Sequence, residues 1–335
     1  MFKDKRGSRR QTLQPAVLAG ALAMSLATLA DDGKGTLTLA LENDLFASGG
    51  DEHYTHGTEI AYVSDTYMPG WFERAAALLP FHDKDDETRF SWSLGQQMYT
   101  PDNLQAETVI ADDRPYAGWL YTSLGLVSES RESGDRHVDT VELVVGLVGP
   151  DSGAENTQKA IHKVLDSDTP KGWDNQLDDE VTVDLRYQRE WTITLVDDHL
   201  DMLPATGFTL GSSQRRAQAG LTLRIGDGLD ADYGPPLIRP RTVGSHYFRS
   251  PQPFYWYVFA GARGQYVDYN IFLNGNRDGD SHSVEPREWV GSVQAGAVMG
   301  WDGWRISITN IFQSREFEKQ DDPDEFGSIA VSYRF

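Results

Sequence analysis

Several stretches of the chain alternate apolar and polar residues with a period of two. In residues 181–191 the odd positions are mainly apolar, while the even positions carry threonine, aspartate, arginine, glutamine and glutamate. Residues 217–226, 304–309 and 328–335 repeat this alternation. Successive side chains of a β-strand point to opposite faces of the sheet. The pattern therefore predicts strands with one apolar face and one polar face.

Two all-β architectures fit such strands, a soluble sandwich and a barrel that crosses an outer membrane. The strands run to about ten residues, the length that a tilted strand needs to cross lipid. The last strand ends on Phe335, which resembles the carboxyl end of outer-membrane proteins. Aromatic residues also lie near strand ends, where an interfacial girdle belongs: Trp119, Tyr121, Trp191, Trp256, Trp301 and Trp304. These features favour an antiparallel transmembrane β-barrel.

The alternating segments and the turns between them predict about twelve strands, an even number, as bacterial barrels require. The predicted strands cover residues 35–43, 54–64, 89–98, 118–128, 136–147, 180–194, 205–212, 216–226, 254–267, 286–298, 303–313 and 326–335. Residues 227–252 contain four prolines, Pro235, Pro236, Pro240 and Pro251, and are expected to form a long irregular connection.

The first thirty residues have the pattern of a secretory signal peptide. A basic start is followed by residues 15–30, which carry no charge and are rich in alanine and leucine. An N-terminal membrane anchor is the alternative, but this stretch is short for a span of about 20 residues. We expect cleavage near Ala30, which leaves residues 31–335 as the barrel.

The composition and the absence of certain motifs exclude several classes of function. Acidic residues outnumber basic ones by 51 to 30, and the formal net charge is −21. Such a chain would be repelled by a nucleic-acid backbone, so we expect no nucleic-acid partner. The sequence has no cysteine, which excludes disulfides, thiolate zinc sites and cysteine nucleophiles. A nucleophile-elbow serine motif and a phosphate-binding glycine loop are also absent from the sequence.

Clusters of polar residues, several with glycine or proline among them, fall at every second turn of the predicted barrel. If the mature N-terminus starts in the periplasm, strand parity gathers these clusters on the extracellular side. They cover residues 42–46, 54–57, 96–102, 113–119, 148–151 and 172–176. A passive pore does not need such an asymmetry, whereas a site in the mouth of a barrel does.

One extracellular helix is predicted, over residues 153–166. Ser152 is the expected N-cap, with Glu155 three residues later as in a capping box. Gln158 and His162 are spaced i, i+4, so they share one face of this helix. A helix laid against the rim could aim both side chains at the strand end formed by residues 43–44.

Each candidate side chain has a functional and a structural interpretation. His162 can be a general base near neutral pH, or an exposed helix histidine without a role. Asn43 and Asp44 can supply oxygen ligands to a hard cation such as calcium, or close an Asx turn. Thr55 can bind a substrate oxygen, or be an ordinary β-branched strand residue. The residues alone leave these alternatives open.

Taken together, six motifs resemble one family, the lipid A 3'-O-deacylases of Gram-negative outer membranes. The motifs are Glu42-Asn43-Asp44-Leu45-Phe46, Tyr54-Thr55-His56-Gly57, Asp113-Arg114-Pro115-Tyr116-Ala117-Gly118-Trp119, the helix with Gln158 and His162, Gly172-Trp173-Asp174-Asn175-Gln176-Leu177, and Leu273-Asn274-Gly275-Asn276. The resemblance implies a twelve-stranded barrel whose active site lies at the outer leaflet, between the wall and a loop helix. It also implies a calcium-dependent esterase that removes the 3'-linked acyloxyacyl chain of lipid A.

The resemblance also implies roles for individual residues. His162 would activate water as the base, with Gln158 beside it, and Asn43, Asp44 and Thr55 would form the wall of the site. A calcium ion would polarise the ester carbonyl and stabilise the oxyanion. Asp168 stands where the family usually has a glutamate, and we expect it to join Asn43 and Asp44 as a metal ligand.

The expected partner is therefore lipid A, or lipopolysaccharide, in the outer leaflet, together with the surrounding outer-membrane lipids. We expect a monomer in the outer membrane whose active site faces the extracellular leaflet. Two other functions fit the same sequence. One is an outer-membrane phospholipase-type acyl hydrolase, and the other is a barrel without catalytic activity, such as a pore or an adhesin.

Overall fold

The computed structural model describes residues 34–46, 53–65, 70–77, 86–132, 135–238, 243–249, 253–279 and 281–335. The predicted signal peptide, residues 1–30, lies outside these ranges, so its cleavage stays a prediction. Among the described residues, no helix has the length and apolar character needed to cross a membrane.

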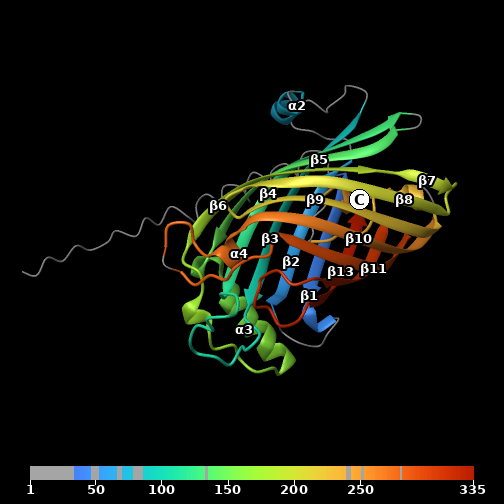
Figure 1. Cartoon of the computed structure of the whole chain (residues 1–335). Helices are drawn as coiled ribbons and strands as arrows, with labels where there is room; N and C mark the ends of the chain where they lie inside the picture. Colours follow the sequence, from blue (N-terminus) through green and yellow to red (C-terminus); the bar gives the residue numbers. More distant parts are fainter. Residues whose placement is uncertain are drawn as a thin grey trace, which may run out of the picture. The chain divides into compact units, whose positions relative to one another are not determined.

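The described strands form one closed antiparallel barrel (Figure 1). Each strand pairs with its neighbours in the sequence, β1 pairs with β13, and β6 pairs with β8, which completes the ring. The strands are β1 (Gly35–Asn43), β2 (His53–Ser64), β3 (Glu87–Thr100), β4 (Ala117–Glu132), β5 (Asp135–Val148), β6 (Glu180–Trp191), β8 (Leu200–Gly211), β9 (Gln214–Asp227), β10 (Phe254–Asn270), β11 (Trp289–Trp301), β12 (Trp304–Gln313) and β13 (Asp324–Arg334). The predicted twelve-stranded barrel is confirmed.

One short extra strand, β7 (Ile193–Val196), pairs with β8. The sequence predicted a single strand over residues 180–194, but β6 ends at Trp191 and β7 begins after Thr192. The next strand also begins earlier than residue 205, because a tight turn with Asp198 in the left-handed region (φ 61) returns the chain at once. The remaining described segments include three short helices, α2 (Gly70–Ala76), α3 (Ala154–Leu165) and α4 (Ile271–Asn274).

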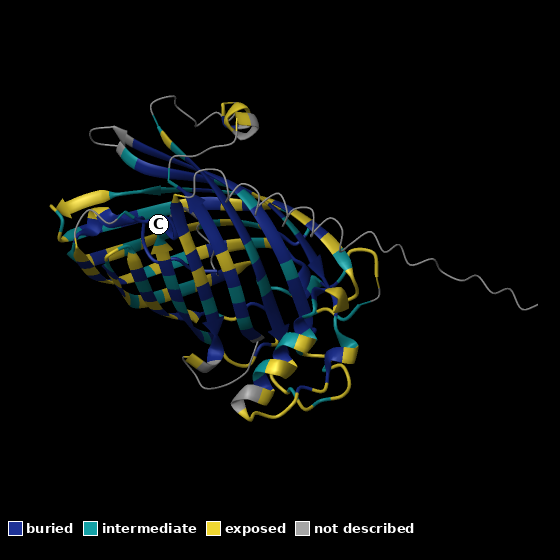
Figure 2. Ribbon diagram, turned by 180° about the vertical axis from the view of Figure 1, so that it is seen from behind, coloured by how far each residue is buried: buried dark blue, intermediate teal, exposed yellow. Residues whose placement is uncertain are grey.

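Alternation along each strand separates two environments. In β1, the side chains of Leu37 and Leu39 are 41% and 44% exposed, while Thr36, Thr38 and Glu42 between and beside them are buried. The same checkerboard of exposed and buried residues is clear on β9 to β12, whereas the residues of β3 and β4 are mostly buried on both faces (Figure 2). The exposed positions are mainly apolar and form the face that lipid would cover, and the buried positions form a polar interior.

Ion pairs hold the interior together. Arg224 on β9 lies between two carboxylates, with Nη2 2.5 Å from Asp201 Oδ2 and Nη1 2.8 Å from Asp232 Oδ1. Arg305 on β12 approaches the same Asp232 at 3.3 Å, and Tyr257 donates its hydroxyl to that carboxylate. All these side chains are fully or nearly fully buried. The network therefore ties strands on separate parts of the ring to one carboxylate.

Asp232 belongs to the connection between β9 and β10, which was predicted only as a long irregular segment. Its described parts, residues 228–238 and 243–249, include the short turns η4 (Leu229–Ala231) and η5 (Val243–His246). Leu237 packs in the same buried cluster as Tyr54, and the backbone N–H of Ile238 donates to Glu42 Oε1 at 2.8 Å. The connection thus turns back into the lumen and fills part of it.

The buried ion network predicts a specific stability effect. Asp232→Ala leaves two buried guanidinium groups without their shared carboxylate and should lower the free energy of unfolding by about 3–5 kcal/mol. Asp268→Ala is the matched control, because Asp268 forms an exposed pair with Arg215 and should cost no more than about 1 kcal/mol. Urea titration of the refolded barrel, followed by tryptophan fluorescence, measures both. Equal losses in the two variants would contradict a stabilising role for the luminal network.

Candidate active site

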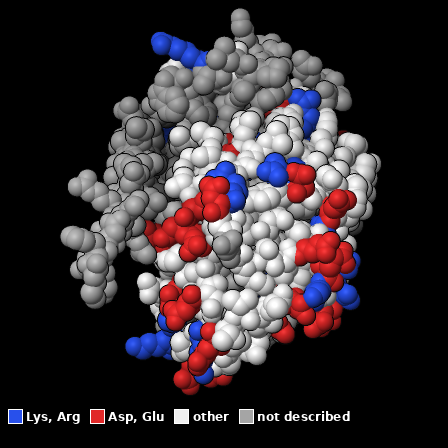
Figure 3. All heavy atoms as spheres, turned by 60° about the vertical axis from the view of Figure 1, so that its left-hand side comes forward, with Lys and Arg blue, Asp and Glu red and all other residues white. Residues whose placement is uncertain are grey.

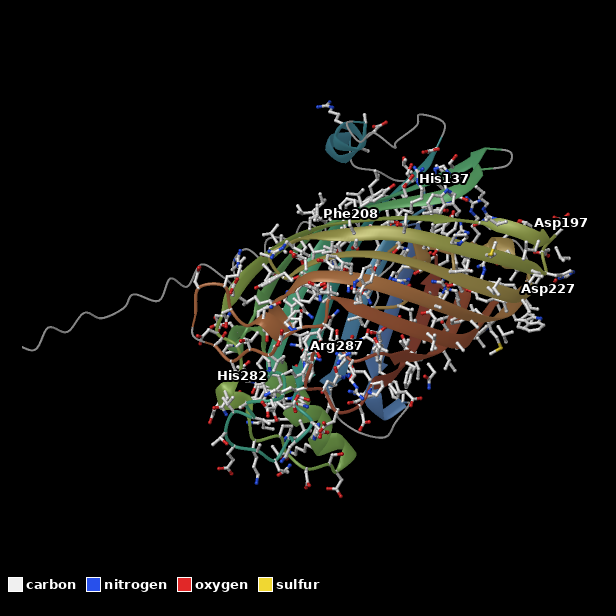
Figure 4. The ribbon with its side chains drawn as sticks, viewed as in Figure 1. His137, Asp197, Phe208, Asp227, His282 and Arg287 are labelled. Carbon is white, nitrogen blue, oxygen red and sulfur yellow. The ribbon has the colours of Figure 1, made fainter. Side chains whose placement is uncertain are left out.

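The polar clusters predicted for one side of the barrel do lie at one end of it. Figure 1 shows α3 and α4 at this end and β7 at the other. Figure 4 places His282 near α4, whereas Asp197 and Asp227 lie at the opposite end. Since β1, β3 and β5 all run toward α3, the turns that follow them meet there.

The first wall of the site is the end of β1 with the start of β2. Asn43 is the last residue of β1 and lies opposite His56 in the register. Its Nδ2 donates to the backbone oxygen of Thr55 at 2.6 Å. Asp44 follows at once in the turn η1 (Asp44–Phe46), and Asn43, Asp44 and Thr55 are all buried. The structure therefore brings the three predicted wall residues together.

A β-bulge decides where Thr55 points. The register between β2 and β3 shifts between Tyr54 and His56, which makes Thr55 the extra residue. Tyr54 points inward, since its hydroxyl donates to the luminal Glu42 at 2.9 Å. Thr55 instead shares a 2.6 Å hydrogen bond between its Oγ1 and that of Thr100.

Thr100 lies on the outer side of the wall. Its neighbour Tyr99 packs in the luminal aromatic cluster, so alternation turns Met98 and Thr100 away from the lumen. The polar groups of this wall, including Thr55, are therefore on the side that faces lipid. The sequence did not indicate Thr100 as a candidate site residue. It joins the site because the bulge in β2 brings the Thr55 hydroxyl to it.

Helix α3 covers this outer face. Ala154 at its start packs with Met98 of β3, Tyr116 and Trp173. Gln96 of β3 donates from Nε2 to the backbone oxygen of Ser152 at 2.7 Å, just before the helix. A Cβ on Gly118 of β4 would collide with Ser152 and Ala154, so the helix can approach only because this position is glycine.

The predicted cap of this helix is wrong, although its predicted extent of 153–166 is close to the observed Ala154–Leu165. The N-cap is Gly153 in the left-handed region (φ 73), which has no side chain, and Ser152 Oγ accepts only from the N–H of the first helical residue, Ala154, at 3.4 Å. Ser152 ends a separate turn, η2 (Pro150–Ser152), which places it one residue too early. Glu155 pairs with Lys159 rather than with a cap.

The loop that follows α3 is hydrogen-bonded to the loop before β4. The loop before β4 and the loop after α3 exchange backbone hydrogen bonds, from Lys171 N to Leu104 O and from Leu177 N to Tyr116 O, each 2.9 Å long. Asn175 adds a side-chain bond from Nδ2 to the backbone oxygen of Glu107 at 2.9 Å. The position of the helix is therefore fixed by β3, β4 and both loops.

His162 lies in the last turn of α3 and is buried. Its Nδ1 lies 2.6 Å from the backbone oxygen of Asp168. A carbonyl oxygen can only accept, so Nδ1 carries the proton and the neutral ring has its lone pair on Nε2. Asp166 in the left-handed region (φ 55) and the bond from Ser167 N to His162 O make the turn that delivers this carbonyl.

Asp168 thus contacts His162 through its backbone, while its side chain is exposed. Among the described residues, no group of three or more histidine, cysteine, aspartate or glutamate side chains is arranged to hold a metal ion. Asn43 and Asp44 still offer the hard oxygen donors that calcium prefers. Calcium, and Asp168 as one of its ligands, stay predictions.

Gln158 lies one helical turn before His162 and is 1% exposed. Its Oε1 accepts a hydrogen bond from Trp173 Nε1 at 2.6 Å. Trp173 was part of a sequence motif, but nothing in the sequence indicated this bond. The arrangement as a whole is a histidine with a fixed tautomer and a buried amide, on a helix that covers a polar, lipid-side wall.

Comparisons with known proteins agree with this architecture. The family model of the outer membrane protein LpxR matches residues 16–335. The chain belongs to the LpxR family. No curated protein sequence matches it. The structure resembles that of LpxR from Salmonella typhimurium, with a TM-score of 0.72, 18% identity and coverage of 90% of this chain and 100% of that one. At this identity the likeness shows a shared fold.

Two other barrels match this structure with lower TM-scores. The KdgM porin has a TM-score of 0.37 and 9% identity, and covers 90% of this chain and 99% of its own. The β domain of the Bordetella autotransporter BrkA has a TM-score of 0.42 and 11% identity, with 90% and 97% coverage.

The close approach of Ser152 and Ala154 to Gly118 predicts that a larger side chain at this position displaces α3. Gly118→Val should force the helix away from the wall, at a cost typical of overpacking, about 1–3 kcal/mol. Trypsin should then cleave at the exposed Lys163 roughly tenfold faster than in the unchanged protein. Gly264→Val is the matched control, since a Cβ there meets nothing within 4 Å. Identical cleavage of both variants would show that Gly118 does not position the helix.

Proposed function

We propose that this protein is a calcium-dependent lipid A 3'-O-deacylase of the outer membrane, an ester hydrolase that removes the 3'-linked acyloxyacyl chain. Membership of the LpxR family supports the substrate class. The observation that carries the proposal is the bond from His162 Nδ1 to the Asp168 carbonyl, on a helix whose start packs with Met98 on the outer side of the wall.

In this proposal His162 is the general base. Its Nε2 takes a proton from water, and the water oxygen attacks the carbonyl carbon of the ester. The Asp168 carbonyl holds the ring in one orientation and accepts a hydrogen bond from the imidazolium that forms. The imidazolium then returns the proton to the sugar oxygen as the carbon–oxygen bond breaks. Water is consumed, and a free fatty acid and a sugar hydroxyl result.

The position of the site suits a substrate that stays in the membrane. Leu39 on β1 and Ile60 on β2 are 44% and 41% exposed on the same strands as Asn43 and Thr55. These apolar side chains would contact acyl chains, and the polar wall lies beyond them toward the rim. An ester of lipid A lies just below the outer surface, so it can reach the site sideways from the leaflet.

Calcium would be held by Asn43 and Asp44, whose oxygen donors fit a hard cation. When bound, it would polarise the ester carbonyl and offset negative charge on the substrate. Several clusters of acidic side chains, with some basic ones beside them, lie on the face shown in Figure 3. At the α3 end, Asp102, Asp112 and Asp321 are among the residues that line a hollow of about 740 Å³. A phosphorylated sugar would be repelled there without divalent cations.

The general base is tested by His162→Ala. The rate of lipid A deacylation should fall by about 10²–10⁴-fold, the usual contribution of a positioned acid–base group. The measurement is mass spectrometry of lipid A from membranes that contain equal amounts of folded protein, with phospholipid analysed in parallel. His199→Ala is the control, because His199 is exposed and belongs to the turn before β8, at the opposite end. Release of acyl chains from phospholipid alone would assign the site to a phospholipase instead.

Calcium dependence is tested by chelation and by Asp44→Asn. Activity should disappear with EGTA and return with added calcium. Asp44→Asn removes the negative charge of the proposed site, so about tenfold more calcium should be needed for half-maximal activity. Asp227→Asn, which alters an exposed residue at the opposite end of the barrel, should leave the calcium requirement unchanged. Full activity in EGTA would exclude the metal from the mechanism.

A further inference from the structure

The side-chain amide of Gln158 has a defined orientation. Trp173 Nε1 lies 2.6 Å from Gln158 Oε1, and both side chains are buried. An indole N–H can only donate, so it must face the oxygen of the amide and not its NH₂ group. The bond therefore directs Gln158 Nε2 away from Trp173.

That NH₂ group is buried and has no hydrogen-bond partner among the described residues. Most buried donors are paired, and an unpaired one in a native site calls for an explanation. Gln158 is also one helical turn from His162, so their side chains share a face of α3. An unpaired donor therefore lies on the same face of α3 as the proposed base.

Most of the groups that fix Trp173 lie outside α3, although Ala154 of the helix belongs to the same buried cluster. Its ring packs on that of Tyr116, with centroids 5.0 Å apart, and contacts Met98 of β3 in the same buried cluster. It begins the turn η3 (Trp173–Asn175), which the backbone bond from Leu177 N to Tyr116 O ties to the β4 side. The indole is therefore a rigid reference for the amide.

We propose that Trp173 is a positioning residue, which fixes the amide of Gln158 so that Nε2 donates a hydrogen bond to the ester oxygen as negative charge develops on it. This inference rests on the proposed function. Gln158 transfers no proton, since the water proton passes through His162 to the sugar oxygen. Without the indole N–H, the amide can rotate by 180° and present Oε1, a lone pair, to the developing negative charge.

The test is a double-mutant cycle on kcat and KM for lipid A deacylation. Gln158→Met removes the donor and should lower kcat by about 10²–10³-fold with little change in KM, as for other oxyanion donors. Trp173→Phe keeps the ring and removes only the N–H, and kcat should fall by about two- to tenfold. In the Gln158→Met background, Trp173→Phe should have no further effect on kcat, because it acts only through the amide.

Controls separate this inference from simpler explanations. Trp304→Phe removes an indole N–H from an exposed residue of β12 and should not change kcat. Tryptic cleavage at Lys163 checks that α3 stays in place in each variant. If Gln158→Met does not fold, Gln158→Glu replaces it, since a carboxylate still accepts from Trp173 but cannot donate when ionised.

The outcomes are distinct. Inactive unchanged protein, or full activity of His162→Ala, overturns the proposed function and this inference with it. If the deacylase and its base are established but Trp173→Phe lowers kcat equally with and without Gln158, only the positioning role is overturned. Loss of the Trp173→Phe effect in the Gln158→Met background supports it.

Discussion

Closure of the sheet into a ring determines which side chains face lipid and which face the lumen. Backbone N–H and C=O groups in lipid must find their hydrogen-bond partners within the protein. The first strand, β1, and the last strand, β13, supply these partners to each other. Once the ring is closed, the alternation of each strand assigns its side chains either to lipid or to the lumen. Apolar positions such as Leu37 and Leu39 face outward, and carboxylates such as Glu42 face inward.

The candidate site is an exception to that assignment. Asn43, Thr55 and Thr100 are polar and lie on the outer side of the wall, where the strands otherwise present aliphatic side chains. Thr55 reaches it through a bulge, which is a common way to redirect one side chain. Polar groups at this depth need a cover that supplies packing and partners. Helix α3 packs against the neighbouring outer face of β3 and β4, and Gly118 gives it room.

The sequence predicted most of the barrel because strand alternation is a local signal. The first predicted strand, 35–43, has the observed bounds of β1, and the helix with Gln158 and His162 differs from α3 by one residue at each end. The break between β6 and β7 escaped prediction, since Thr192 interrupts neither the apolar pattern nor the strand propensity. Likewise, four prolines indicate an irregular connection but cannot show that it enters the lumen.

The sequence could predict at which end of the barrel the candidate residues lie, but not their contacts. Motif spacing placed Asn43, Asp44, Thr55, Gln158 and His162 at one end of the barrel, and the structure places them there. The sequence could not show that Asp168 meets His162 through its backbone, because that contact depends on a left-handed turn at Asp166. It also could not pair Trp173 with Gln158, since the two come from different segments whose packing is tertiary.

The ion pairs that stabilise the barrel lie on the luminal side of the wall, and the residues of the proposed chemistry lie on its outer side. Buried charges in the lumen, such as Arg224 with Asp201 and Asp232, bind the ring to the connection inside it. The outer side carries the groups with unusual placement, a histidine of fixed tautomer and an amide with an unpaired donor. In the proposed mechanism, α3 carries the base His162 on the outer side of the wall, where the start of the helix packs with Met98 of β3. The ester proposed as the substrate would then approach along the lipid side of the wall, where the acyl chains of a membrane lie.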